Sequence, residues 1–210
     1  MKIIVLFLLV SIIPFCVYSK DPLPKDKYAI GKVFKKNNDT LNVYIKIESF
    51  YNMQLRIQYV DSMGVEHQLL PSKAKGFSLI YQNETMVFEA RHDLTKVVFQ
   101  PRLPDYFFIN RISTGRFSLY FFIEKKLVME GIDQVEAEKS RYLVLYNDDW
   151  YPISKDYFRG DCSKIFTFLK REGFITESKK LLKDLNSNGF KYETTPALID
   201  RINQLIPKED

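Results

Sequence analysis

The segment from Gly115 to Ile123 constrains the fold of this chain more than any other. Its apolar residues fall at every second position, namely Phe117, Leu119, Phe121 and Ile123. Successive side chains of an extended backbone point to opposite faces, so the alternation predicts a strand. β-prone segments precede it from Tyr28 onward, and we therefore expect it to be the central strand of one sheet-based core.

Further strands are predicted wherever short alternating or apolar segments lie between turn residues. They are residues 28–34, 40–47, 55–59, 65–70, 76–81, 86–90, 96–100, 106–112, 141–146 and 150–153. Polar turns such as Asp61-Ser62-Met63-Gly64 are typical of β-hairpins. After the opening strand, residues 124–126 are predicted to turn the chain and residues 131–140 to form a polar surface loop.

Beyond Ile153 the apolar period changes to that of helices. We expect three helices, capped by Asp161, Thr176 and Thr195, the last with Pro196 in its first turn. The predicted fold class is therefore α+β. An antiparallel β-sheet or sandwich-like body occupies residues 28–153, and a C-terminal helical tail at residues 154–210 packs on that body.

The first nineteen residues are typical of a secretory signal peptide. One positive charge, Lys2, precedes an apolar run that ends in Val17-Tyr18-Ser19, and we expect cleavage after Ser19. A retained membrane anchor is the alternative, but Ser11 and Pro14 interrupt the run, which is short for a bilayer span.

A lipid-modified Cys16 is a further alternative to simple cleavage. The residue before it is Phe15, where such sites usually have a small side chain, so we disfavour this modification. Residues 20–27, with Pro22 and Pro24, are predicted to be a flexible leader. We expect an extracytoplasmic location, periplasmic, cell-surface or secreted, with no transmembrane segment after cleavage.

The charge of the chain argues against nucleic acid as a partner. Thirty-one basic and 26 acidic residues give a net charge of +5, which becomes +5 − 1 = +4 once Lys2 is removed with the signal. This excess is weak and scattered, which favours solubility over nucleic-acid binding. Only Cys162 remains after cleavage, so the core must be stable without an intramolecular disulfide.

No catalytic, metal or cofactor site is predicted. A nucleophilic Cys162 would need an imidazole beside it, and the two histidines, His67 and His92, lie far away in sequence in the β-rich body. No Gly-x-Ser-x-Gly elbow and no glycine-rich phosphate loop occur. Two isolated histidines and one cysteine give no zinc spacing, and Asn147-Asp148-Asp149 is too short for a calcium loop.

Four tyrosines on the predicted strands are candidates for a ligand platform. They are Tyr44, Tyr59, Tyr81 and Tyr120. Aromatic rings exposed side by side on a sheet bind sugars or peptides through their flat faces. This hypothesis requires the four rings to be exposed and coplanar.

Several short patterns along the chain are similar to those of a known group. They are Asp39-Thr40-Leu41, Tyr59 with Asp61 and Gly64, Pro71 with Gly76-Phe77, Gly115 with Leu119-Tyr120, and Asp161-Cys162. Their layout resembles a group of uncharacterised secreted or envelope proteins of Bacteroidetes-type bacteria. The resemblance implies an envelope location and a β-rich body with a helical tail, and it implies no chemistry.

We therefore expect an exported, non-catalytic envelope or secreted module that binds an unknown protein or glycan partner. The alternative is an extracytoplasmic hydrolase whose site forms only in three dimensions, from carboxylates or from Cys162.

Overall fold

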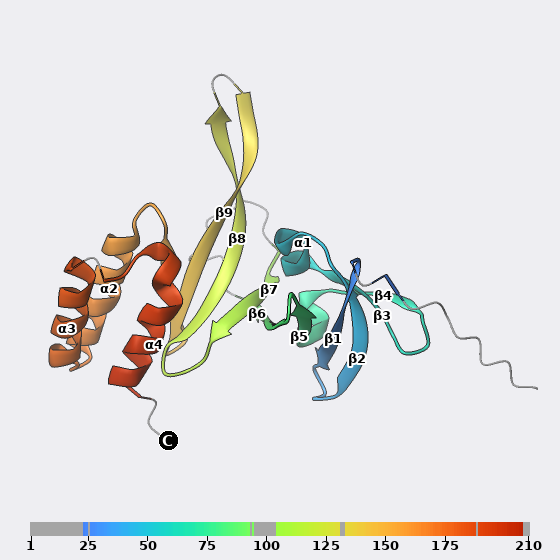
Figure 1. Ribbon diagram of the computed structural model, residues 1–210, viewed down its shortest axis with the longest axis horizontal. Helices are drawn as coiled ribbons and strands as arrows, with labels where there is room; N and C mark the ends of the chain where they lie inside the picture. The colour runs from blue at the N-terminus through green and yellow to red at the C-terminus, as the bar shows by residue number, and fades with distance from the viewer. Residues whose placement is uncertain are drawn as a thin grey trace, which may run out of the picture.

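The computed structural model describes residues 23–24, 26–92, 94, 104–130, 133–187 and 189–207. Ten strands form a single antiparallel sheet with the order β10-β9-β8-β7-β6-β5-β1-β2-β3-β4 (Figure 1). The strands are β1 (Tyr28–Lys35), β2 (Thr40–Lys46), β3 (Ile57–Val60), β4 (Glu66–Leu69), β5 (Ala74–Tyr81), β6 (Glu84–His92), β7 (Tyr106–Ser113), β8 (Ser118–Glu130), β9 (Asp133–Tyr146) and β10 (Asp149–Ser154).

The helices complete an α+β fold and lie mostly at the C-terminus. They are α1 (Phe50–Leu55), α2 (Phe158–Arg171), α3 (Ile175–Asn186) and α4 (Thr195–Leu205), with short 3₁₀ turns at Pro71–Lys73 and Tyr192–Thr194. The predicted fold class is confirmed. Of the two architectures considered, the body is a sheet and not a sandwich.

The two faces of the sheet are distinguished by what covers them. The helix face carries Leu119, Val144 and Ile153, which pack against α2, α3 and α4 in one hydrophobic cluster. The same face of β1, β2, β5 and β6 encloses a second cluster around Ile45 and Phe77, together with Met53 of α1. The opposite face, called here the groove face, carries a third cluster on β7, β8 and β9.

The segment predicted as the central strand is β8, which is interior but third from one edge of the sheet. The alternation of apolar residues in this strand also does not identify all of its buried positions. Leu119 is buried on the helix face, whereas Tyr120 and Phe122 are buried on the groove face. Both faces are buried because the helices pack on one, and on the other Tyr120 and Phe122 pack with Leu94 and with apolar residues of β7 and β9.

Two predictions for the chain after Ile123 are wrong. Residues 124–126 do not turn the chain, since β8 continues to Glu130, and residues 133–140 of the predicted loop belong to β9. The charges that were interpreted as a turn instead alternate along a ladder. Lys125 pairs in register with Glu138, and its ammonium lies 3.6 Å from the carboxylate of Glu136.

The helix α1 was missed, and three predicted caps are displaced. Residue 55 was assigned to a strand, but Ser49 caps a short helix by accepting a hydrogen bond from the Asn52 amide. The helices α2, α3 and α4 begin at Phe158, Ile175 and Thr195, so the residues predicted as caps lie inside the first turns. Hydrophobic spacing locates a helix better than it locates its end.

Two amide side chains, the buried Gln54 and the partly buried Asn203, bind the backbone of the β8 segment. Gln54 of α1 accepts from the Ile123 amide at 2.7 Å and donates to the Ile123 carbonyl at 2.8 Å, where β7 no longer pairs with β8. Asn203 of α4 does the same for Phe117, at 2.8 and 2.9 Å. Each amide therefore substitutes for a missing neighbouring strand.

The predicted signal peptide, residues 1–19, and the predicted strand at 96–100 lie outside the described residues. Among the helices that are described, none combines the length and the apolar character that a membrane span requires.

Replacing Gln54 tests the contribution of its amide to stability. Gln54→Leu replaces the amide with an apolar side chain of similar size and leaves the Ile123 amide and carbonyl without their partner. We therefore expect the free energy of unfolding to fall by about 2–4 kcal/mol. Urea unfolding followed by circular dichroism measures this change. Asn52→Ala, at an exposed position of the same helix, should change stability by less than about 0.5 kcal/mol. Equal effects of the two substitutions would contradict the role given to Gln54.

Candidate functional site

An open groove of about 890 Å³ lies on β1, β5, β6 and β7. It takes five cationic side chains from these strands and their turns: Lys32, Lys36, Lys75, Arg91 and Arg111. Phe34 and Val87 contribute apolar surface, and Glu89 is the one carboxylate among the lining residues. The groove thus combines an apolar floor with a cationic rim.

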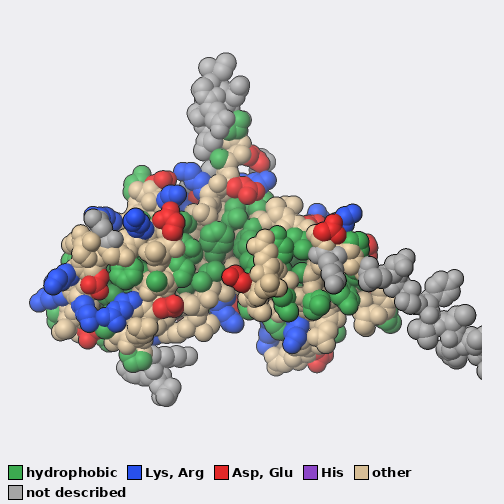
Figure 2. All heavy atoms as spheres, in the orientation of Figure 1, with side chains coloured by type: hydrophobic (Ala, Val, Ile, Leu, Met, Phe, Trp, Pro, Cys, Tyr) green, Lys and Arg blue, Asp and Glu red, His purple; other side chains and the backbone are tan. Residues whose placement is uncertain are grey.

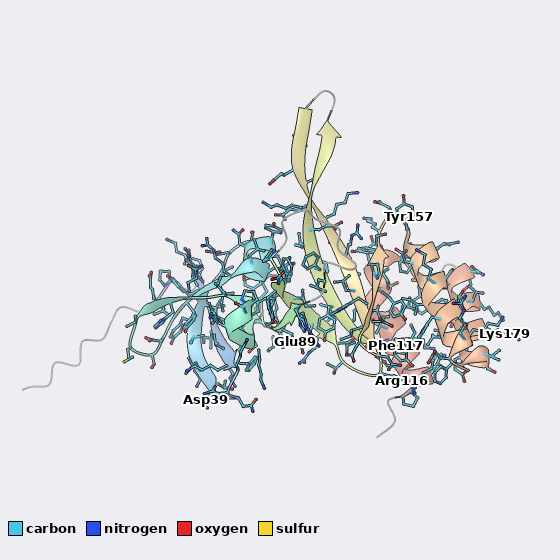
Figure 3. All side chains as sticks on the ribbon, turned by 180° about the vertical axis from the view of Figure 1, so that it is seen from behind. Asp39, Glu89, Arg116, Phe117, Tyr157 and Lys179 are labelled. Carbon is cyan, nitrogen blue, oxygen red and sulfur yellow. The ribbon has the colours of Figure 1, made fainter. Side chains whose placement is uncertain are left out.

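Strand alternation and register explain why Glu89 meets its partners. Glu89 and Arg91 are two residues apart on β6, so both project to the groove face. Arg111 of β7 is paired with Val87 on one side and with Tyr120 of β8 on the other. The four polar side chains therefore come from three adjacent strands. Glu89 is labelled in Figure 3, near the middle of the molecule.

Glu89 is held by both arginines and by Tyr120. Its carboxylate forms ion pairs with Arg111 and with Arg91, the latter at 2.7 Å. The Tyr120 hydroxyl donates to Glu89 Oε2 at 2.9 Å and accepts from Arg91 Nη2 at 2.6 Å. Two guanidinium groups face one carboxylate, so the network retains one positive charge.

Burial strongly favours the neutral form of Tyr120. Its ring is 1 % exposed, lies beneath the Arg91 guanidinium at 5.4 Å and packs edge-on against Trp150. Desolvation, together with the nearby Glu89 carboxylate, raises the pKa of Tyr120 to about 12. Tyr120 is thus a neutral hydrogen-bonding residue under physiological conditions.

The three groove lysines make the local charge more positive. No carboxylate among the described residues forms an ion pair with Lys32, Lys36 or Lys75. Lys75 donates to the side chain of Asn38, and the Lys36 ammonium lies 5.9 Å from the centre of the Tyr106 ring. Five cations and one carboxylate give the groove a charge of 5 − 1 = +4.

The structure does not gather the four candidate tyrosines into one platform. Tyr44 is exposed on the groove face, whereas Tyr59 pairs with the buried Ile45 and so lies on the other face. Tyr81 shares the face of Tyr59 by strand parity, and Tyr120 is buried. The coplanar arrangement that the hypothesis required is absent for these four residues.

His67 belongs to a second, smaller pocket of about 270 Å³ on β1, β2, β3 and β4. Its ring stacks on Tyr59 and lies 2.8 Å from the Asp61 carboxylate. The hydrogen bond with His67 lowers the pKa of Asp61, as do the backbone amides of Val65 and Met63. Since Asp61 also organises the turn, the pair has a structural explanation.

Cys162 is not placed beside either histidine. It lies in α2 inside the cluster against β9 and β10, whereas β4, which carries His67, forms the opposite edge of the sheet. His92, on β6, stacks on Tyr106. Burial, followed by the charge of Asp161, raises the pKa of the Cys162 thiol to about 12, so this thiol is a poor nucleophile.

No group of three or more histidine, cysteine, aspartate or glutamate side chains with a geometry suited to a metal ion occurs within the described part of the chain. No protein-family model matches this chain, and neither a curated protein nor a solved structure matches it. The groove is therefore interpreted from its own chemistry.

The sequence analysis missed the groove residues. The spacing of Glu89 and Arg91 on one predicted strand was a usable signal, because it places both on the same face. Their contact with Arg111 and Tyr120 depends on the register of three strands, which a local pattern does not contain.

The raised pKa of Tyr120 predicts a loss of stability at alkaline pH. Between pH 10 and 12 the unfolded tyrosine has lost its proton while the folded one retains it, so the wild type should lose about 1.4 kcal/mol per pH unit through this group. The variant Tyr120→Phe has no hydroxyl to ionise, so it should not lose stability in this way. The stability difference between the wild type and the variant should be constant below about pH 9 and should shift in favour of the variant above pH 10.

Denaturant unfolding at a series of pH values measures this difference. A difference that stays constant to pH 12 would contradict the assignment.

Proposed function

We propose that the protein is an exported, non-catalytic module whose cationic groove binds an acidic polypeptide segment. The observation that carries the proposal is the grouping of five basic side chains around one neutralised carboxylate in an open groove. The opposite charge of an acidic segment would be attracted to this rim, and its apolar side chains would cover the floor formed by Phe34 and Val87.

The ionic state of the groove supports an anionic ligand. Glu89 is already engaged by two arginines, so it offers little attraction to a cationic ligand. Lys32 and Lys75 are exposed, so they can approach a ligand without losing a carboxylate partner. A glycan ligand is less well supported, because the four tyrosines do not form a flat aromatic surface for sugar rings.

The hydrolase alternative has less support. Its thiol version requires an ionised Cys162, and this residue is fully buried with a raised pKa. The carboxylate in the groove, Glu89, forms ion pairs with Arg91 and Arg111 and accepts a hydrogen bond from Tyr120, so its oxygens are already engaged by the protein.

Export is part of the proposal, and it rests on the sequence of residues 1–19 and on the resemblance to secreted bacterial proteins. Expression of the full chain in a Gram-negative host, followed by N-terminal sequencing of the extracytoplasmic fraction, should give a protein that begins at Lys20. Ser19→Phe places a large side chain at the cleavage position and should block processing. Recovery of a membrane-bound wild type that keeps Met1 would favour the anchor instead.

Ligand binding can be tested with a labelled hexaglutamate peptide. Fluorescence anisotropy at low ionic strength should detect binding to the processed wild type, and hexalysine should not bind. The double variant Lys32→Glu, Lys75→Glu, called here the groove-reversed variant, should weaken the binding of hexaglutamate by about tenfold or more.

The matched control is Lys179→Glu, Lys180→Glu. It makes the same charge change on the exposed side of α3, and Figure 3 shows Lys179 at the end of the molecule opposite β1 and β2. This variant should bind hexaglutamate nearly as well as the wild type. Equal weakening by both double variants would show a non-specific effect of net charge and would contradict a site in the groove.

A further inference from the structure

Three exposed apolar side chains form a row on the groove face, next to the groove. Ile30 of β1 is paired in register with Tyr44 of β2, and the pairing of Gly31 with Leu79 places Ile30 opposite Ile80 of β5. The exposed fractions of Ile30, Tyr44 and Ile80 are 63, 45 and 53 %. These three side chains, called here the apolar row, come from three adjacent strands that are about 4.8 Å apart.

The packing of the sheet does not account for the apolar row. An antiparallel sheet usually carries apolar residues on its packed face and polar residues on its solvated face. On β1 and β2 the alternate residues, such as Val33 and Val43, already supply the buried cluster on the helix face. Single exposed apolar residues are common, but apolar side chains grouped at a surface mark a site of contact with another molecule.

The apolar row continues directly into the cationic groove. Lys32 lines the groove and is two residues from Ile30 on β1, so both side chains project from the same face, about 7 Å apart. Ser78 and Thr85 also line the groove. Ser78 is two residues from Ile80 on β5, and Thr85 of β6 is paired with Ile80. One bound segment can therefore contact the groove cations and the apolar row together.

The charges on the two sides of the row differ in what already binds them. On the side away from the groove, Lys46 donates to Gln58 at 2.8 Å and lies 3.7 Å from the Glu48 carboxylate. On the groove side, Lys32 is exposed and forms no ion pair with a carboxylate of the described residues. A ligand that covers the row is therefore attracted through its carboxylates toward the groove.

Positive charge alone does not distinguish the groove from the rest of the surface. Figure 2 shows Lys and Arg side chains over the helical end of the molecule as well, where α2 and α3 lie in Figure 1. The groove differs because an apolar row adjoins its cations. This combination fits a ligand that carries acidic and apolar side chains next to each other.

We infer that the acidic segment bound by the groove carries apolar residues at one end, and that the apolar row binds them. This inference rests on the proposed function, because it specifies which acidic segments the groove prefers. The carboxylates lie along the groove cations, and the apolar end covers Ile30, Tyr44 and Ile80. Apolar burial adds affinity that salt does not screen, whereas the charged contacts weaken as ionic strength rises.

Four labelled peptides test the inference by fluorescence anisotropy. Each is hexaglutamate extended by three leucines or by three serines, at either the N-terminal or the C-terminal end, because the row adjoins the groove on one side. For one of the two ends, the leucine peptide should bind the processed wild type about tenfold or more tightly than the serine peptide. This ratio should persist when about 0.15 M salt is added, although both peptides then bind more weakly.

The variant Ile30→Thr, Ile80→Thr, called here the row variant, removes apolar surface and keeps β-branched side chains that suit strands. It should bind the serine peptide as the wild type does and lose most of the preference for leucine. The single variant Ile30→Thr, at the most exposed position of the row, should lose part of this preference and replaces the double variant if that one does not fold.

The matched control is Ile175→Thr, Leu182→Gln, which replaces two similarly exposed apolar residues of α3 with polar ones. It should keep the full preference for leucine. Circular dichroism and thermal unfolding check that each variant is folded before binding is measured.

The outcomes separate this inference from the proposed function. Leucine peptides that bind no more tightly than the serine peptides overturn the inference, as does a preference for leucine that the row variant retains. Binding of hexaglutamate that the groove-reversed variant loses would then still support the proposed function. A wild type that binds neither hexaglutamate nor any extended peptide would overturn the proposed function as well.

Two other occupants of the row are tested in the same buffer. A polypeptide is favoured over a membrane, because an extended segment can enter the groove of about 890 Å³ and a flat bilayer surface cannot. The wild type should not bind phosphatidylglycerol vesicles in a flotation assay, and sedimentation velocity should show no more self-association than in the row variant. Vesicle binding or self-association that the row variant loses would assign the row to that occupant and overturn the inference.

Discussion

The fold depends on how the backbone of the β8 segment is held at two points where no strand is available to pair with it. Gln54 and Asn203, from helices far apart in sequence, each satisfy the amide and the carbonyl of one residue, Ile123 and Phe117. A primary amide suits this task because it carries a donor and an acceptor side by side, as a peptide group does. Gly115 shows how closely α4 approaches, since a Cβ atom there would lie 2.5 Å from the Asn203 amide. The two contacts connect α1 and α4 to the same strand.

That strand also joins the three hydrophobic clusters. Leu119 belongs to the cluster under the helices, and Tyr120 and Phe122 belong to the cluster on the other face. Phe50 of α1 contacts both Phe88 and Phe121, at ring distances of 5.2 and 5.4 Å, and so connects β6 with β8 across β7. The strands β6, β7 and β8 can therefore carry a polar network on the groove face, because apolar packing on the helix face holds these strands together. The position of the groove beside this network follows from the same arrangement.

Most strands, the order of elements and the apolar stripe of α4 could be predicted, because each is visible as a period of two or of 3.6 in the sequence. The helix α1 was missed because it is only six residues long and its main local signal is the Ser49 cap. The long continuation of β8 and β9 was missed because a Glu-Lys-Lys run is usual both in turns and in exposed ladders, and only the pairing of Lys125 with Glu138 distinguishes them. The groove was not predicted for the same physical reason, since the contact between Glu89 and Tyr120 is set by strand register. Tyr120 itself was predicted to line an exposed platform, and non-local packing buries it.

The distribution of charge is the feature that stability alone does not explain. Like charges grouped on one surface repel one another, and a chain with 26 acidic residues has ample carboxylates to intersperse among five groove cations. Glu89 is the one placed there, and it neutralises only one of the two guanidinium groups that surround it. The ladder of β8 and β9 differs in this respect, because Lys125 is paired in register with Glu138 and lies 3.6 Å from the carboxylate of Glu136. Departures from locally favourable arrangements concentrate at functional surfaces, because their cost is offset only when a partner is bound. The positive groove is such a departure, and the acidic segment that we propose as its ligand would offset the repulsion among its cations.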